Sequence, residues 1–470
     1  MRKTACLENS ISPILALARA GAVSRAWDQF HASGLNGSPN TDTLTLKGRL
    51  LKDQARQAHG ETSAQLYLES AQAYADAALL KPDSYPLINA ATMSLFAGHA
   101  DQMRTLANEV LALIETGAGR GETPYWHAAT RAEALLLVGE VNAAKSALAE
   151  AIAHAPRAWE DHATTLRQFR QIINFRGEDH SWLCDYSPPP SLYFSGTIGL
   201  AANDLIAATA VQNAVAEINP GFGFGALAAG ADILIAEALI DKGAELHVVL
   251  PAIPSVFKAV SVDPFGPEWG ARFDSLIQKA ATVEIIDGGP TLSMAAVNIA
   301  AQVARGRAVD NAARMESQST DLLVTIVGHM SPATAAGNVL RLEPTAAVDK
   351  QSALDPKAQL VLVGITTGAI DDISITAFAD IASVEQAVKE FRASRPEATI
   401  AVSLGVDHGA PEAPRARIER MLRSASKGTI ISSTEAAMAL KARNSLMWLE
   451  PIGELPDAAG AITLYAIDVT

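Results

Sequence analysis

The 470 residues include 37 basic and 51 acidic side chains, a net charge of −14, and 49% of them are hydrophobic. Because a single hydrophobic core stops growing near about 250 to 300 residues, this length predicts two or three domains. The negative charge repels phosphate backbones and anionic lipids, so we expect no nucleic acid as a partner.

The sequence also argues against disulfides, structural metal and membrane insertion. Its two cysteines lie far apart and have no metal-type or redox-type spacing, which is typical of a reducing compartment. No run of about 18 uncharged apolar residues occurs. We therefore expect a cytoplasmic protein that does not span a membrane and has no metal site.

Small and aromatic residues recur over residues 1–186 at the offsets of tetratricopeptide hairpins, which are about 34 residues long. Two copies are Gly139, Ala144, Leu148, Ala151 and Pro156, and earlier Tyr67, Tyr74, Ala77 and Pro82. Each hairpin buries its apolar face only by stacking on a neighbour, which leaves a concave surface for a partner. We predict a helical-repeat domain over residues 1–186, with a plain helical bundle as the alternative.

Residues 40–175 resemble the TRAFs-binding repeat domain of apoptosis-signal-regulating kinases and of bacterial signalling proteins. The similarity lies in Thr43-Leu44, in Lys47 to Asp53 and in Pro82 to Thr92. It implies a scaffold or regulatory role, with a protein partner on the repeat surface. The sequence has no His-Arg-Asp or Asp-Phe-Gly motif, so no kinase is expected.

Apolar strands and helices alternate after the proline-rich linker that begins at Ser187. The predicted strands are 191–196, 246–250, 284–286 and 322–327, and the predicted helices include 203–217 and 233–242. This alternation predicts a doubly wound parallel sheet over residues 187–345, so the chain as a whole is multidomain α + α/β.

Glycines punctuate this central region at Gly221, Gly223, Gly225 and Gly230. Such residues allow an anion to approach backbone N–H groups at a helix N-terminus. The dinucleotide fingerprint is incomplete, because Ala228 occupies the position of its third glycine. A tight packing turn between strand and helix is the alternative, and the spacing does not separate the two.

Phe222 to Asp232, with Gly243 to Pro251, are similar to the nucleotide-sensing Rossmann-like group. That group includes the DNA-processing protein DprA, the lonely guy phosphoribohydrolases and ligand sensors of bacterial signalling and defence. The resemblance implies a nucleotide-derived ligand at Gly196, Thr197, Gly221, Gly223, Gly225, Gly230 and Asp232. The phosphoribohydrolase signature Pro-Gly-Gly-x-Gly-Thr is absent, which argues against hydrolysis. Arg272 follows the third strand and is expected either to bind a phosphate or to form a surface salt bridge.

Residues 346–470 again alternate strands and helices and resemble a class III nucleotidyl cyclase domain, which implies a ferredoxin-like α/β fold. The similarity lies in Asp372 to Phe378, Val402 to Gly409 and Gly428 to Thr434. Arg417 is retained, but Ala413 stands in place of the family's asparagine and the first strand has no aspartate. Asp371 or Asp372 could replace one metal ligand. We expect an inactive pseudo-cyclase domain with a structural or dimerising role.

These patterns together predict a regulatory signalling protein that binds a nucleotide-derived ligand in the central domain and a protein partner on the repeats. No catalytic residue and no cofactor is assigned. One alternative is an enzyme at the glycine-rich cleft, acting as an N-glycosidic hydrolase or a residual cyclase, with Asp232 and Glu237 as candidate carboxylates. Another is a scaffold without a ligand, in which the glycine loop is packed shut.

Overall fold

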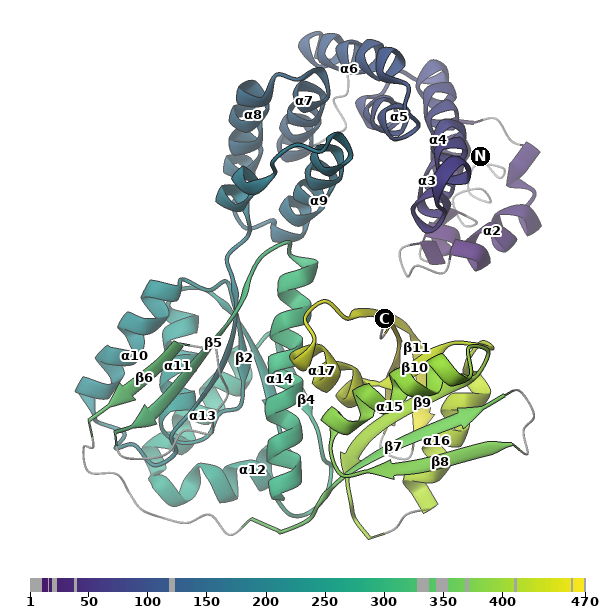
Figure 1. The fold of residues 1–470 in the computed structure, drawn as a ribbon. Coiled ribbons are helices and arrows are strands. Elements are labelled where there is room, and N and C mark those ends of the chain that lie inside the picture. Colours follow the sequence, from purple (N-terminus) through teal and green to yellow (C-terminus); the bar gives the residue numbers. More distant parts are fainter. Residues whose placement is uncertain are drawn as a thin grey trace, which may run out of the picture. The chain divides into compact units, whose positions relative to one another are not determined.

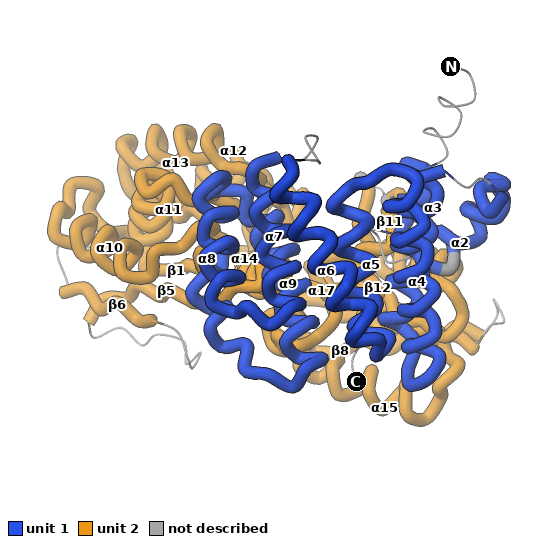
Figure 2. Tube along the Cα trace, turned by 90° about the horizontal axis from the view of Figure 1, so that it is seen from above, with its two compact units in different colours: residues 1–188 blue, residues 189–470 orange. Residues whose placement is uncertain are grey.

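The computed structural model describes residues 11–15, 17–18, 23–37, 40–117, 123–327, 338–343, 354–367, 372–409, 412–457 and 460–468. The chain forms two compact units, residues 1–188 and residues 189–470 (Figure 2). The expected domain boundary between residues 345 and 346 lies outside the described residues, as does Asp371. Among the helices that are described, none combines the length and the apolar character needed to cross a membrane.

The first unit is helical, and most of its helices pack against the next helix in sequence (Figure 1). Its elements are α2 (Val23–Ala32), η1 (Leu35–Gly37), α3 (Thr41–Gln57), α4 (Gly60–Leu80), α5 (Ser84–Phe96), α6 (Ala100–Glu115), α7 (Pro124–Val138), α8 (Val141–His154), α9 (Trp159–Arg176) and η2 (Ser181–Tyr186). The helix ends follow from capping residues. The side chain of Asn40 accepts a hydrogen bond from the Thr43 N–H at 2.8 Å, and Pro124 opens α7.

The predicted repeat residues lie where helical hairpins need small or buried side chains. Gly139 ends α7 with a φ of 93°, and Ala144, Leu148 and Ala151 are fully buried on α8. Gly48 lets α3 approach α4, because a Cβ at this position would lie 2.8 Å from Cδ2 of Tyr74. The prediction of an N-terminal helical region is confirmed.

The second unit begins with a six-stranded sheet in which every pairing is parallel. Its strands are β1 (Ser191–Gly196), β2 (Phe222–Gly225), β3 (Glu245–Leu250), β4 (Thr282–Ile285), β5 (Ser319–Ile326) and β6 (Asn338–Leu342), in the order β4-β3-β2-β1-β5-β6. Its helices are α10 (Leu205–Ile218), α11 (Ala231–Asp241), α12 (Pro254–Ser261), η3 (Asp263–Phe265), α13 (Pro267–Lys279) and α14 (Met294–Arg314). The strand order reverses between β1 and β5, so right-handed connections place α14 on the face opposite α10, α11 and α13.

A second six-stranded sheet in the same unit is mixed. It contains β7 (Gln359–Thr366), β8 (Ile373–Phe378), β9 (Thr399–Val406), β10 (Ile430–Ser433), β11 (Trp448–Asp457) and β12 (Gly460–Asp468), in the order β11-β12-β10-β9-β7-β8. Helices α15 (Ile381–Ser394), α16 (Glu412–Ser424) and α17 (Thr434–Arg443) connect them. Only β9 and β10 pair in parallel, and β7 lies between β8 and β9, which α15 joins. The chain therefore contains an α-helical region and two α/β sheets.

Helix α14 serves both sheets of the second unit. It packs against β1, β2, β3 and β5 and also against α17 (Figure 1). The contact with α17 is close, because a Cβ added at Gly306 would lie 2.0 Å from the Met438 carbonyl oxygen. Arg307 of α14 donates to Glu284 on β4 at 3.0 Å and to the Tyr465 hydroxyl on β12 at 3.1 Å. These contacts explain why the two sheets form one compact unit.

Candidate functional site

The glycines of the central motif lie largely within a buried strand rather than in an open turn. Gly223 and Gly225 belong to β2, and the N–H of Gly221 donates to the carbonyl of Pro190 at 3.0 Å. A Cβ at Gly223 would lie 2.3 Å from Leu239 Cδ1, and one at Gly225 would lie 2.6 Å from the Phe194 carbonyl oxygen. Close packing accounts for both glycines. Substituting either one would therefore disturb the packing of the sheet, whether or not a ligand binds nearby.

Gly196 and Gly230 also lie at close backbone approaches. A Cβ at Gly196 would lie 2.4 Å from the Ala231 Cβ. Gly230 precedes α11 with a φ of 123°, and its Cβ would lie 2.7 Å from the Thr197 carbonyl oxygen. The structure therefore brings Gly196, Thr197 and Gly230 together at the start of α11.

The carboxylate of Asp232 occupies the donor-rich position where the sequence predicted an anion. It is 6% exposed and accepts hydrogen bonds from the Gly196 N–H at 2.8 Å and the Ala228 N–H at 3.2 Å. Burial raises the pKa of Asp232 to about 7, and the two N–H donors act against this rise. The Thr197 N–H donates to the Val324 carbonyl at 2.9 Å. These backbone donors thus have partners within the fold, and ligand binding by this group stays a prediction.

Arg272 forms an ion pair within the unit. Its guanidinium donates to both carboxylate oxygens of Glu237, one of them at 2.7 Å, and to the Ala202 carbonyl at 3.1 Å. It also lies over the Trp269 ring, 4.2 Å from the centroid. The salt bridge that the sequence left open is present, and its partner is Glu237, one of the two carboxylates considered as catalytic candidates.

A polar cavity of about 480 Å³ lies in the helical unit, lined by α3, α5, α7 and α9 together with Tyr74 of α4. Four cationic side chains line it: Arg49, Lys52, Arg56 and Arg167. Only two carboxylates, Asp53 and Glu133, share the wall. The lining therefore carries an excess of positive charge in a chain whose net charge is −14.

Helix α3 supplies most of this charge because of its residue spacing. Arg49, Lys52, Asp53 and Arg56 follow one another at intervals of three, one and three residues, which places them on one face of a helix. Arg49 Nε lies 3.7 Å from Asp53 Oδ2, and Arg56 Nη1 lies 3.6 Å from Asp53 Oδ1. Arg49 Nε and Asp53 Oδ2 are buried, and neither has a hydrogen-bond partner among the described residues.

Lys52 occupies an unusual environment for an ammonium group. Its Nζ donates to Asn89 Oδ1 at 3.3 Å and to Gln168 Oε1 at 3.5 Å, both of them neutral acceptors. Burial and, to a smaller extent, the charge of Arg56 lower the pKa of Lys52 to about 7, while Glu133 and Asp53 oppose the shift. A partly buried cation whose two contacts to amide oxygens are long is well placed to bind an added anion.

Glu133 and the aromatic side chains complete the cavity. Glu133 accepts hydrogen bonds from Thr92 Oγ1 at 2.5 Å and Gln168 Nε2 at 3.2 Å, and burial raises its pKa. Tyr74, Tyr85 and Trp126 form aromatic parts of the wall. The arrangement combines groups that bind phosphate or carboxylate with surfaces on which a flat ring can stack.

The sequence alone did not predict this cavity. Lys47 to Asp53 stood out only through the resemblance to a TRAFs-binding repeat domain. The one feature of the sequence that could have indicated the cavity was the charged face of α3, but such a face more often lies in solvent. The remaining charges come from α7 and α9, about 80 to 115 residues further along the chain, so only the folded array brings them together.

Comparison with known proteins supports the helical assignment. A family model described as Tetratricopeptide Repeats-Sensor matches residues 11–94. No curated protein matches the chain. The matched residues are similar to a tetratricopeptide-type sensor domain, and they include α3 with its four charged cavity residues.

Proposed function

We propose that this chain is a regulatory sensor protein whose helical unit binds a small anionic ligand, a nucleotide or nucleotide derivative, in the cavity between α3 and α9. The observation that carries the proposal is the excess of cationic side chains in one cavity with aromatic walls, in a chain that is acidic overall. Similarity of residues 11–94 to a repeat sensor family supports a regulatory role.

The chemistry of the lining favours a nucleotide over a simple anion. Arginine forks bind phosphate oxygens with two parallel hydrogen bonds, which suits Arg49, Arg56 and Arg167. Tyr85 and Trp126 offer rings for a base, and stacking of a base on an aromatic side chain contributes about 1 to 3 kcal/mol. A volume of about 480 Å³ lies within the range of small-molecule sites.

The second unit is then the regulated part. Its parallel sheet is proposed to be Rossmann-like, and its mixed sheet a degenerate cyclase-like domain that dimerises. The surface of the repeats, which resemble a TRAFs-binding domain, is proposed to hold a protein partner. The glycine cleft at Gly196 and Asp232 is the weaker nucleotide site, because packing and internal hydrogen bonds give its residues a structural role. The same contacts weigh against the enzyme alternatives at that cleft.

The test is isothermal titration of the full chain with ATP, ADP, cyclic AMP, cyclic dinucleotides, NAD and ADP-ribose. Arg56→Gln and Arg167→Gln are each expected to weaken binding about tenfold or more, since a hydrogen bond to a charged group contributes about 1.5 to 3 kcal/mol. Arg104→Gln is the matched control, because Arg104 is an exposed arginine of α6 outside the cavity.

Two outcomes would contradict the proposal. If a nucleotide binds with equal affinity to the wild type and to both cavity variants, the site lies elsewhere, and the glycine cleft becomes the next candidate. If none of these compounds binds, the helical unit acts as a protein scaffold without a ligand. Pull-down of partners by the repeats would then be the experiment to pursue.

A further inference from the structure

A second cavity, of about 630 Å³, lies within the α/β unit, between the end of β4 and the mixed sheet. Much of its wall is aliphatic, with Ile253, Ile285 and Ile286 on one side and Leu362, Leu404 and Val406 on the other. Its titratable side chains are Asp287, His408, Arg417 and Glu435. The cavity therefore has a few polar groups set in an apolar frame, which is typical of small-molecule sites.

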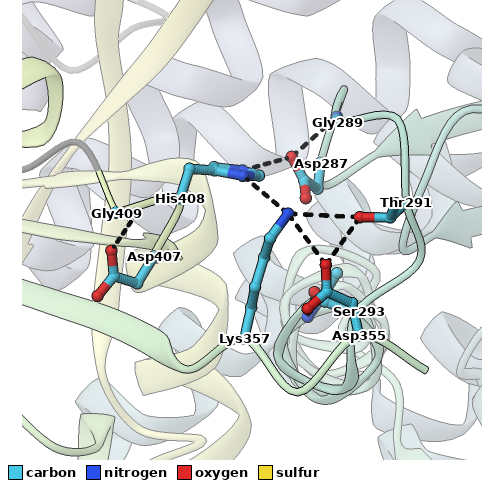
Figure 3. A network of polar contacts seen from close by, with 10 residues as sticks. Asp287, Gly289, Thr291, Ser293, Asp355, Lys357, Asp407, His408 and Gly409 are labelled. Atoms are coloured by element: carbon cyan, nitrogen blue, oxygen red, sulfur yellow. Dashed lines mark hydrogen bonds and ion pairs between the residues drawn. The ribbon is translucent and has the colours of Figure 1, made fainter.

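A network of polar contacts fixes Asp287 (Figure 3). Lys357 Nζ contacts Thr291 Oγ1 at 3.3 Å and Asp355 Oδ2 at 3.4 Å, and it lies 3.4 Å from Nδ1 of His408. An ammonium group only donates, so Nδ1 accepts and the imidazole carries its proton on Nε2. Nε2 therefore donates to Asp287 Oδ1 at 3.0 Å.

The same oxygen of Asp287 has a second donor, and the other oxygen has none. The Gly289 N–H also donates to Oδ1, at 3.0 Å. Oδ2 is buried and lacks a hydrogen-bond partner among the described residues. Asp287 as a whole is only 8% exposed, so little water reaches this oxygen. Buried carboxylate oxygens nearly always have donors, so an orphaned oxygen on a cavity wall indicates a position for a ligand.

Glu435 presents a second orphaned oxygen at the same cavity. It is the second residue of α17, and its Oε2 is buried without a hydrogen-bond partner in the described part of the chain. Burial raises the pKa of Glu435, and the charge of Arg417 acts in the opposite direction. Two carboxylates, one after β4 and one on α17, thus share one cavity, and each has an oxygen that lacks a donor.

We propose that this cavity binds a small organic molecule that presents N–H donors on an apolar frame, as amidines, guanidines and amino-substituted heterocycles do. Such a ligand satisfies both orphaned oxygens while its frame contacts the isoleucine, leucine and valine side chains. The described residues contain no group of three histidine, cysteine, aspartate or glutamate side chains able to hold a metal, which favours an organic ligand. This site is independent of the helical cavity and has the opposite preference, for donors rather than anions.

The test is isothermal titration of the full chain with benzamidine, agmatine, adenosine and guanosine. The first two probes carry amidine or guanidine groups and the last two carry amino-substituted rings, so the comparison identifies the source of the donors. Asp287→Asn and Glu435→Gln are each expected to weaken binding by about tenfold or more, because each places an amide N–H where an acceptor stood. Glu390→Gln, at an exposed position on α15, is the matched control and should leave the affinity unchanged.

Circular dichroism and thermal unfolding would verify that both variants fold. Failure of all four probes to bind the wild type would overturn the proposal, and so would binding that neither variant weakens. Higher thermal stability of the variants, without binding by the wild type, would show that the two carboxylates are merely unpaired. Arg56→Gln must leave binding of these probes intact, so a failure here is distinct from a failure of the nucleotide proposal.

Discussion

Lys52 should make nucleotide binding in the helical cavity depend on pH near neutrality. Burial lowers its pKa to about 7, and an anion bound beside its Nζ would raise that pKa again. Binding therefore takes up a proton when the pH lies above about 7. The affinity should therefore fall as the pH rises through the pKa of Lys52 in the unliganded protein.

The magnitude follows from the fraction of charged Lys52. With a pKa of about 7 this fraction falls from about 0.9 at pH 6 to about 0.1 at pH 8, so the affinity should fall roughly tenfold between these values. The unliganded protein should respond in the opposite direction. The unfolded chain binds more protons between about pH 7 and about pH 10, so its free energy of unfolding should rise with pH in that window.

The assay is titration calorimetry in buffers of different ionisation enthalpy, which measures the protons taken up. The probe should be a phosphodiester such as cyclic AMP, whose charge is constant over this range. Lys52→Arg is the decisive variant, because arginine stays charged and should flatten the profile while keeping affinity. Lys52→Met should bind weakly at every pH.

The carboxylates facing Lys52 provide a further check. Burial raises the pKa of both Glu133 and Asp53, and protonating either would also favour an anion at lower pH. In Glu133→Gln the tenfold change should persist with its midpoint at lower pH, because a charge that raises the pKa of Lys52 is gone. A profile that is flat in Glu133→Gln but unchanged in Lys52→Arg would refute the reasoning and assign the titration to Glu133.

Three further predictions concern packing and electrostatics. Gly306→Ala should lower the free energy of unfolding of the α/β unit by about 1 to 3 kcal/mol in urea titrations, because its Cβ overlaps Met438; Gly405→Ala, with no atom within 4 Å, is the control. Asp232→Ala should lower the free energy of unfolding by about 1 to 3 kcal/mol for each of the two N–H groups that it leaves without an acceptor. If the variant and the wild type unfold with equal free energy, the structural role given to this carboxylate is wrong. Raising the salt concentration to about 1 M should weaken nucleotide binding in the helical cavity, and calorimetry that finds no change would exclude the cationic wall as its cause.

The sequence predicted several elements closely because their patterns follow from burial. Residues 191–196 form β1 as expected, because Leu192, Tyr193 and Phe194 are consecutive large apolar residues and a central parallel strand is buried on both faces. The expected helices 203–217 and 233–242 correspond to α10 and α11, with ends shifted by one or two residues. The expected strand 246–250 corresponds to β3, which begins one residue earlier.

The departure at β2 has a specific cause. Phe222 to Gly225 contain two glycines, which have low strand propensity, and the motif therefore resembled a phosphate-binding turn. What selects glycine there is the proximity of Leu239 and Phe194, which are distant in sequence. A single sequence does not distinguish a glycine required by a neighbouring side chain from one required by a ligand.

The two cavities were beyond sequence reasoning for a related reason. Lys52 and Arg167 are 115 residues apart, and Asp287 and Glu435 are 148 residues apart. No single motif contains both members of either pair, and each residue taken alone has the pattern of an ordinary charged surface position. These groups become neighbours only in the folded protein, where α3 shares a cavity with α7 and α9 and where the two sheets pack around α14.

Helix α14 determines where the second unit can be truncated without exposing its core. Its buried residues are mostly alanine, with Gly306 at the closest contact, so the helix has little obvious hydrophobicity in a sequence plot. A fragment that stops at residue 343 keeps all of α14 but loses α17, and the surface around Gly306 becomes exposed to water. The shortest piece that keeps the contacts of α14 intact is therefore residues 189–470, with both sheets present.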